Sequence, residues 1–416
     1  MLPADLVIEN ASELLTIRGA SSRPKTGKSM SSLGIIRDGA VAVSRGKISW
    51  VGASDRLRGS VRVGPRTKVI DASGRVVMPG LIDCHTHLVF AGSREREWLD
   101  RLSGRRSRGA TGILSTVSAT RRASDSELTK LALANLGSML SSGTTTAEAK
   151  SGYGLSIRDE LRILAILGRL GAMQPVEIVP TFLGAHAVPG EFDGSASYTR
   201  FVIDDMLPRV VRQGIAKYCD VFCERGAFTA DESLDILRAC KAEGLKPRIH
   251  TDEFSDIGGT DVANKVHAAS ADHLDAITPN GVRNIKAAGS IAVLMPGVPF
   301  FLGSDAYADA RGLIDAGIPV ALATDFNPGT CPCLSLQFIV SLACIKLGMS
   351  PAEALSAVTI NAAHAIGMAD TIGSIEAGKQ ADIVIMDVGD HRLVPYGIAR
   401  NSVHTVIKRG GIVVQG

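Results

Sequence analysis

The sequence predicts an α/β fold: a (β/α)8 TIM-like barrel with a small β-sandwich domain formed by both ends of the chain. Between about residues 78 and 369, strand-like apolar runs alternate with helical patterns, which indicates a parallel sheet. The number of these units favours a closed barrel over a doubly wound sheet, and no Gly-x-Gly-x-x-Gly fingerprint opens a helix. Hairpin patterns occur near both ends, and short hairpins are marginally stable alone, so we expect them to pair.

The predicted domain boundaries follow from these patterns. The small β domain should comprise residues 1–77 and 370–416, and the barrel residues 78–369. "GAVAVSRGKISWVG" near the start and "HTVIKRGGIVVQG" near the end alternate apolar and polar residues around a turn, with the strand "ADIVIMD" just upstream of the second. The Ser- and Lys-rich stretch "SSRPKTGKSMSS" has no periodicity and predicts a mobile surface loop.

The elements of the barrel can be assigned in chain order. "DSELTKLALANLGSML" has leucines at helical spacing, an acidic first turn and Gly143 beyond its end, so it predicts a helix. The strand "TTTAEAK" follows, and then come the helix "RDELRILAILGRL" and the strand "VEIVPTFLGA". The helix "DESLDILRACKAEG" leads to the strand-like "KPRIHTDE", and "GSIAVLMPG" and "IPVALATDF" complete the series.

Composition argues against several classes of function. The net charge is +3 over 416 residues, and no basic stripe with interleaved aromatic residues points to a nucleic-acid partner. No stretch of about 18 uncharged apolar residues suggests a membrane span. Seven cysteines are an odd number, and the first residues lack a signal-peptide pattern, so we expect a cytoplasmic protein.

Polar residues collect where the predicted strands end, which is where a parallel barrel carries its functional groups. Five of the nine histidines lie there. The residues at these positions are Asp83, His85, His87, Lys150, Tyr153, His186, His250, Glu253, Asp272, His273, Asp325, Asn327 and Thr330.

The spacing of His85 and His87 predicts a metal site. Residues two apart on a strand point to the same face, which is the interior of a closed barrel, so both imidazoles can bind one cation. A catalytic site needs one or two more protein ligands, and His250 and Asp325 are the preferred candidates. Asp83 lies on the same face and is a candidate for orienting a ligand histidine. His186 and His273 are candidates for substrate contacts, with a second metal left open.

Several segments together resemble the imidazolonepropionase family of the amidohydrolase superfamily over nearly the whole chain. These segments are "PGLIDCHTHLVFAGSRERE", "EAKSGYGL", "TFLGAHAVP", "DVFCERGAF", "HTDEFSDIGG", "SADHL", "ALATDFNPGT" and the trailing "GSIEAGKQADIVIMD". The resemblance implies hydrolysis of 4-imidazolone-5-propanoate to N-formimidoyl-L-glutamate in histidine degradation, at one Zn or Fe ion per chain.

The resemblance also implies residue roles. The metal ligands would be His85, His87, His250 and Asp325, and the substrate contacts would be Arg94, Tyr153, His186, Glu253, Asn327, Gly329 and Thr330. Asp325, His273 and Glu253 would be catalytic: Asp325 can carry a proton and His273 can stabilise charge on the carbonyl oxygen. Arg94 has a planar fork suited to the carboxylate tail of the substrate.

One departure from the family pattern lies at residues 104–112. The family continues after "RL.G" with a segment that carries a substrate-contacting Tyr, whereas this chain has the shorter "RLSGRRSRGATGI". We hypothesise that Arg105, Arg106 or Arg108 provides an anion contact in its place.

Other interpretations stay open. A dihydroorotase, hydantoinase or nucleobase deaminase would be favoured if Lys150 were carboxylated and bridged two metals. A noncatalytic barrel scaffold is a further alternative for the function. As to assembly, a homodimer is possible. "CPC" at residues 331–333 favours a structural role over metal binding.

Overall fold

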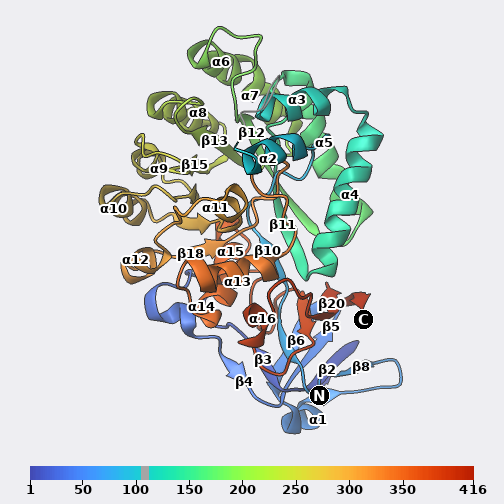
Figure 1. Cartoon of the computed structure of the whole chain (residues 1–416). Helices are drawn as coiled ribbons and strands as arrows, with labels where there is room; N and C mark the ends of the chain where they lie inside the picture. Colours follow the sequence, from blue (N-terminus) through green and yellow to red (C-terminus); the bar gives the residue numbers. More distant parts are fainter. Residues whose placement is uncertain (105–111) are drawn as a thin grey trace.

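Eight parallel strands form the barrel predicted from the sequence (Figure 1). The computed structural model describes residues 1–104 and 112–416. The barrel strands pair with their neighbours in chain order: β10 (Leu81–Asp83), β11 (Thr144–Lys150), β12 (Glu177–Ala185), β13 (Tyr218–Cys223), β15 (Ile249–Thr251), β16 (Ser270–His273), β17 (Ile291–Leu294) and β18 (Val320–Leu322). The two-residue β14 (Lys246–Pro247) also pairs with β13.

The barrel closes just beyond the ends of β10 and β18. Thr86 forms a parallel bridge with Phe326, which joins the two segments. The Asp325 N–H donates to the His85 carbonyl at 3.1 Å, and the His87 N–H donates to the Phe326 carbonyl at 2.9 Å. Backbone pairing at the seam therefore places the His-x-His segment beside Asp325.

Most helices follow the barrel strands and cover the outside of the barrel, whereas the short α1 lies with the sheets outside it. Their starts agree with the sequence signals: Ser124 caps the helix that begins at Asp125, and Thr229 and Glu232 form a capping box. The helices are α1 (Leu57–Ser60), α2 (Glu95–Leu102), α3 (Ile113–Arg122), α4 (Asp125–Ser141), α5 (Ile157–Met173), α6 (Ser195–Phe201), α7 (Leu207–Gln213), α8 (Ala230–Ala242), α9 (Gly259–Val266), α10 (Pro279–Ala288), α11 (Gly297–Leu302), α12 (Ala310–Asp315), α13 (Leu336–Lys346), α14 (Pro351–Ala357), α15 (Ile360–Ala365) and α16 (Leu393–Tyr396). Within the described ranges, none of them combines the length and apolar character needed to cross a bilayer.

Both ends of the chain contribute strands to the sheets outside the barrel. A six-stranded sheet has the order β21-β20-β19-β9-β3-β4, a four-stranded sheet has the order β6-β5-β2-β8, and β1 pairs with β7. Their bounds are β1 (Leu2–Pro3), β2 (Leu6–Ala11), β3 (Glu13–Leu15), β4 (Ile35–Ile36), β5 (Gly39–Ser44), β6 (Lys47–Ala53), β7 (Val61–Arg62), β8 (Lys68–Asp71), β9 (Val76–Pro79), β19 (Ile383–Met386), β20 (Val403–Lys408) and β21 (Gly411–Gln415).

A separate apolar core joins the two larger sheets into the expected sandwich. It includes Ile8 and Val41 from the four-stranded sheet and Val77, Ile383 and Ile407 from the six-stranded sheet. Figure 1 shows both termini in this smaller part of the molecule. The exact domain limits stay a prediction, and the expected limit at residue 77 falls inside β9.

One local expectation was wrong. The stretch "SSRPKTGKSMSS" is not simply an exposed loop, because it contains the short helix η1 (Gly27–Ser31) with a fully buried Met30. The Ser356 hydroxyl donates to the Met30 carbonyl at 2.7 Å, and Asn361 bonds the backbone of Lys25. The pattern showed no period because a single inserted side chain, rather than one face of a helix, is buried.

Candidate active site

Three side chains meet where the barrel closes. The Asp325 Oδ1 atom lies 3.4 Å from the His85 Nε2 atom and 3.3 Å from the His87 Nε2 atom. His250 enters from the end of β15, and its ring centroid is 4.4 Å from that of His85. All four side chains are buried, so their polar atoms need partners inside the protein.

The unpaired atoms of this cluster suit a metal ion. Within the described residues, the Nε2 atoms of His85 and His250 and the Oδ1 atom of Asp325 have no hydrogen-bond partner, although each is buried. Burying polar atoms without partners is costly, and a cation satisfies two imidazole nitrogens and a carboxylate oxygen together. His85, His87 and Asp325 form one group with ligand atoms close enough to share an ion, and His85, His250 and His273 form another.

Carboxylates orient two of these histidines. The Asp272 Oδ2 atom lies 2.7 Å from the His85 Nδ1 atom, and the Asp220 Oδ1 atom lies 3.1 Å from the His250 Nδ1 atom. Such pairing fixes the imidazole tautomer and directs Nε2 toward the cluster. The expectation that Asp83 would orient a ligand histidine is wrong, because its carboxylate accepts hydrogen bonds from the Thr324 N–H and hydroxyl instead.

Burial favours the neutral form of several histidines at the site. It lowers the pKa of His85, His87 and His186 well below the usual value, and it lowers the pKa of His273 to about 3. Neutral imidazoles present lone pairs to a cation without repelling it. Burial also raises the pKa of the Glu253 carboxyl group well above its usual range, which favours its protonated form.

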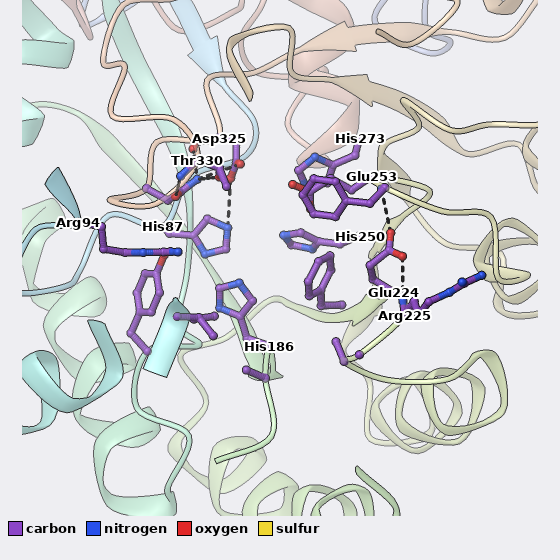
Figure 2. A pocket seen from close by; sticks show the side chains of 18 residues that line it. His87, Arg94, His186, Glu224, Arg225, His250, Glu253, His273, Asp325 and Thr330 are labelled. Carbon is purple, nitrogen blue, oxygen red and sulfur yellow. Dashed lines mark hydrogen bonds and ion pairs between the residues drawn. The ribbon is translucent and has the colours of Figure 1, made fainter. Parts of the chain in front are cut away.

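A cavity of about 270 Å³ opens above the cluster. Most of the predicted site residues line it: His87, Arg94, Tyr153, His186, His250, Glu253, His273, Asp325, Asn327 and Thr330. Figure 2 shows Arg94 on the His87 side of this pocket, and Glu224 and Arg225 on the His250 side. Asp325 and His273 have φ angles of +50° and +83°, and such backbone strain in non-glycine residues is typical of functional sites.

The segment after Asp325 is organised by the Asn327 side chain. Its amide nitrogen donates to the Asp325 carbonyl and carboxylate at 2.8 and 2.9 Å, and its oxygen accepts the N–H groups of Gly329 and Thr330 at 2.8 Å each. Its side chain therefore holds Asp325 and the turn together.

Gly329 does not line the cavity. A Cβ atom on this residue would lie only 1.8 Å from the Arg94 Nη1 atom, so the glycine makes room for the guanidinium. The Nε and Nη2 atoms of Arg94 donate to the Glu97 Oε2 atom at 3.0 and 2.7 Å, which fixes the plane of the group.

Other predicted features lie apart from the cluster. Lys150 points into a buried ion network and not into the cavity, with its Nζ atom 2.9 Å from Glu148 Oε1 and 2.8 Å from Asp220 Oδ2. Cys331 and Cys333 belong to none of the three groups of candidate metal ligands found among the described residues. The hypothesis on Arg105, Arg106 and Arg108 falls on residues outside the described part of the chain.

Sequence reasoning missed the roles of Glu148, Asp220 and Arg248, which lie with Lys150 and Asp272 beneath the cluster and are fully buried or nearly so. A signal was present in the sequence. Each is a charged residue inside an apolar strand pattern, in "TTTAEAK", "YCDVFC" and "KPRIH". Charges in buried strands need partners, so three such strands in one barrel indicate a shared network.

Comparisons with known proteins agree with the geometry. The amidohydrolase family matches residues 76–413. The chain is 50% identical to the imidazolonepropionase of Geobacillus kaustophilus (strain HTA426), with 98% of each chain covered, and 45% identical to that of Symbiobacterium thermophilum, with 100% of this chain and 98% of the relative covered.

Solved structures share the fold at low sequence identity. A 5-methylcytosine deaminase from Klebsiella pneumoniae has a TM-score of 0.75 at 17% identity, with 99% of this chain and 97% of that chain covered. An adenosine deaminase from Xanthomonas campestris with bound Zn has a TM-score of 0.72 at 19% identity, with 100% and 94% covered. At these identities the likeness concerns the fold alone.

Proposed function

The chain belongs to the imidazolonepropionases of the amidohydrolase family, and we propose that it hydrolyses 4-imidazolone-5-propanoate to N-formimidoyl-L-glutamate in histidine degradation. The observation that carries this proposal is a buried His and Asp cluster with unpaired ligand atoms, which faces a cavity that also contains a fixed arginine. Hydrolysis of a cyclic amide with a carboxylate tail needs both features: the cluster to activate water and the arginine to bind the tail.

We propose that His85, His87, His250 and Asp325 hold one Zn or Fe ion. Three neutral imidazoles and one carboxylate are a common donor set for such ions. When bound, the ion acts as a Lewis acid and lowers the pKa of a water molecule toward about 7. The remaining tasks of the reaction fall to the side chains of the protein.

Substrate binding is assigned to the side of the pocket that carries Arg94. Its guanidinium can pair with the propanoate tail, and Tyr153 and His186 can add hydrogen bonds. Burial raises the pKa of the Tyr153 phenol, so it stays a donor across the working pH range. Thr330 completes this wall of the pocket, and Asn327 and Gly329 act by holding the turn and by leaving space for Arg94.

Proton transfer is assigned to Asp325. In the proposed reaction, the water oxygen bonds to the ring carbonyl carbon, and Asp325 takes the water proton. When the bond between this carbon and the ring nitrogen breaks, the proton passes to the nitrogen, which leaves as part of the formimidoyl group. The neutral His273 can donate a hydrogen bond to the carbonyl oxygen as it gains charge. The His273 Nε2 atom lies 3.6 Å from Glu253, whose carboxyl group helps to orient the ring.

The ion network around Lys150 favours one metal over two. Burial disfavours the charge on Lys150, but Asp220 and Glu148 outweigh this effect and raise its pKa. An amine must lose its proton before it can be carboxylated, and a lysine between two carboxylates keeps it. This weakens the alternative of a dihydroorotase-like or hydantoinase-like site with a bridging lysine.

We also propose a cytoplasmic location and a small-molecule partner that carries a carboxylate. All seven cysteines are unpaired, which agrees with a reducing compartment.

The test is a substrate panel. Purified protein should consume 4-imidazolone-5-propanoate, followed by its loss of ultraviolet absorbance, and should leave dihydroorotate and hydantoin unchanged. Turnover of either control compound without turnover of the first would refute the specific activity and leave the amidohydrolase assignment in place.

A further inference from the structure

Two histidines of the metal cluster are each supported by a buried carboxylate that is itself paired with a buried cation. We propose that Lys150 and Arg248 are positioning residues that act through these carboxylates and determine how firmly the site retains its ion. The inference rests on the metal role proposed above for His85 and His250.

The first support runs from Arg248 to His85. The Arg248 Nη2 atom donates to the Asp272 Oδ2 atom at 2.9 Å, and the same oxygen lies 2.7 Å from the His85 Nδ1 atom. Arg248 also donates to the Cys84 carbonyl at 2.8 Å. One guanidinium therefore fixes both the ring of His85 and the backbone just before it. None of these side chains is exposed to solvent.

The second support runs from Lys150 to His250. The Lys150 Nζ atom lies 2.8 Å from Asp220 Oδ2, and the other oxygen of this carboxylate lies 3.1 Å from the His250 Nδ1 atom. Lys150 comes from β11 and Asp220 from β13, so the ammonium spans the barrel interior past β12. Its contact of 2.9 Å with Glu148 and its distance of 3.9 Å from Asp272 connect the two supports.

His87 lacks such support. Within the described residues its carboxylate contact is that of its Nε2 atom with Asp325, not one at Nδ1, and its ring stacks on His186 with centroids 4.8 Å apart and planes 16° apart. The two supports therefore act on His85 and His250 alone. If either cation is lost, its carboxylate loses the charge that holds it in place, and the histidine loses its fixed orientation.

The test measures zinc release from the full-length, zinc-loaded protein to a chromophoric chelator. Lys150→Met should release zinc about 10- to 100-fold faster than the wild type, in line with other losses of carboxylate support to a ligand histidine. Arg248→Met should do the same through His85. The visible spectrum of the Co(II)-loaded Lys150→Met protein should also change, because the orientation of His250 changes.

Lys379→Met is the matched control. Lys379 is a buried lysine at the sandwich, where its ammonium donates to the Ala369 carbonyl at 2.5 Å. The Lys379→Met substitution should lower the unfolding temperature and leave the zinc release rate unchanged. A general loosening of the fold would instead accelerate release in both lysine variants and would overturn the inference.

A double-mutant cycle separates positioning through Asp220 from a general structural role. If Lys150 acts through Asp220, then Lys150→Met in an Asp220→Asn background should change the release rate by less than about threefold. Additive effects, or wild-type release from Lys150→Met, would overturn the proposal. Lys150→Gln serves the same test if the Met variant does not fold.

Failure of the positioning role can be distinguished from failure of the proposed function. Wild-type protein that binds zinc but does not hydrolyse imidazolonepropanoate would refute the function and leave the release experiment valid. Wild-type protein that binds neither zinc nor iron would overturn both. An active wild type with unchanged release in the Lys150 and Arg248 variants would overturn the positioning role alone.

Discussion

Gly329 shapes the pocket because it has no side chain. The Arg94 guanidinium lies where a side chain at residue 329 would otherwise be, and Glu97 fixes its plane from the other side. A planar cation held on two sides loses little further freedom when it binds a carboxylate. The affinity for the carboxylate tail therefore depends on a backbone position as well as on the arginine.

Gly329→Ala should therefore displace Arg94 and raise the KM for imidazolonepropanoate. Loss of a charged hydrogen-bond pair corresponds to about a 10- to 100-fold increase, and kcat should change much less. Steady-state kinetics measure both constants. Gly171→Ala is the control, because a Cβ at this exposed position in α5 meets nothing within 4 Å. An unchanged KM in Gly329→Ala would contradict the role given to Arg94.

Asp275 offers a test of burial near the pocket. Burial raises the pKa of its carboxyl group to about 8, and the unfolded value is about 4. At a pH between the two pKa values, Asp275 is protonated in the folded state and ionised in the unfolded state. The free energy of unfolding of the wild type therefore falls as pH rises through this range. The Asp275→Asn substitution removes this pH dependence. The amide oxygen of the substituted side chain can still accept the hydrogen bond that the Ala308 N–H donates to Asp275 Oδ1 at 3.0 Å in the wild type.

The free energy of unfolding of Asp275→Asn relative to wild type should therefore rise from pH 4 to pH 8 and level off above that. The rise should exceed about 1.4 kcal/mol, the equivalent of one pKa unit. Urea titrations at pH 5, 7 and 9 measure it. A difference that stays constant over this range would show that the carboxyl group is not held protonated by the fold.

At the scale of elements, the site depends on how the ends of strands are joined. The bridge between Thr86 and Phe326 closes the barrel and sets His85 and His87 beside Asp325. The alternating pattern after β10 predicted the shared face of the two histidines, because side-chain direction has a period of two. The pattern could not reveal which carboxylate would lie behind each ring, since that depends on contacts between strands.

The difference between Asp83 and Asp272 illustrates this limit. Both are acidic residues at strand ends, and the strand period of two, which puts Asp83 on the face of His85 and His87, favoured Asp83 as the residue that orients a ligand histidine. In the structure Asp272, which is far away in sequence, bonds the ring of His85, and Asp83 bonds Thr324. Local spacing predicts the face of a strand but not the partner across a barrel.

Helix α8 gives a prediction at this scale. Thr229 caps its start through the Glu232 N–H at 3.2 Å, and Glu232 accepts the Thr229 N–H at 2.9 Å in return. Thr229→Ala should lower the free energy of unfolding by about 1 kcal/mol, with unchanged KM, because the cap lies outside the pocket. Urea denaturation measures the loss. Ser138→Ala, at an exposed position inside α4, should cause no loss, and equal losses in both variants would contradict the capping role.

At the scale of the whole molecule, sequence predicted the barrel, the sandwich and the joining of both termini in one part of the fold. These features follow from periodicity and from the need of short hairpins to pair. The ion network beneath the site and the buried Met30 were not predicted. Both depend on single side chains that find partners far along the chain. Charged residues inside apolar strands indicate that such partners exist, but periodicity does not show which residues they are.

The most direct test of the central claim is metal reconstitution. Protein stripped of metal by chelation should not hydrolyse imidazolonepropanoate, and stepwise addition of Zn or Fe should restore activity linearly up to one ion per chain. This result follows from a single set of ligands, His85, His87, His250 and Asp325. Full activity in metal-free protein, or a requirement for two ions per chain, would contradict the account.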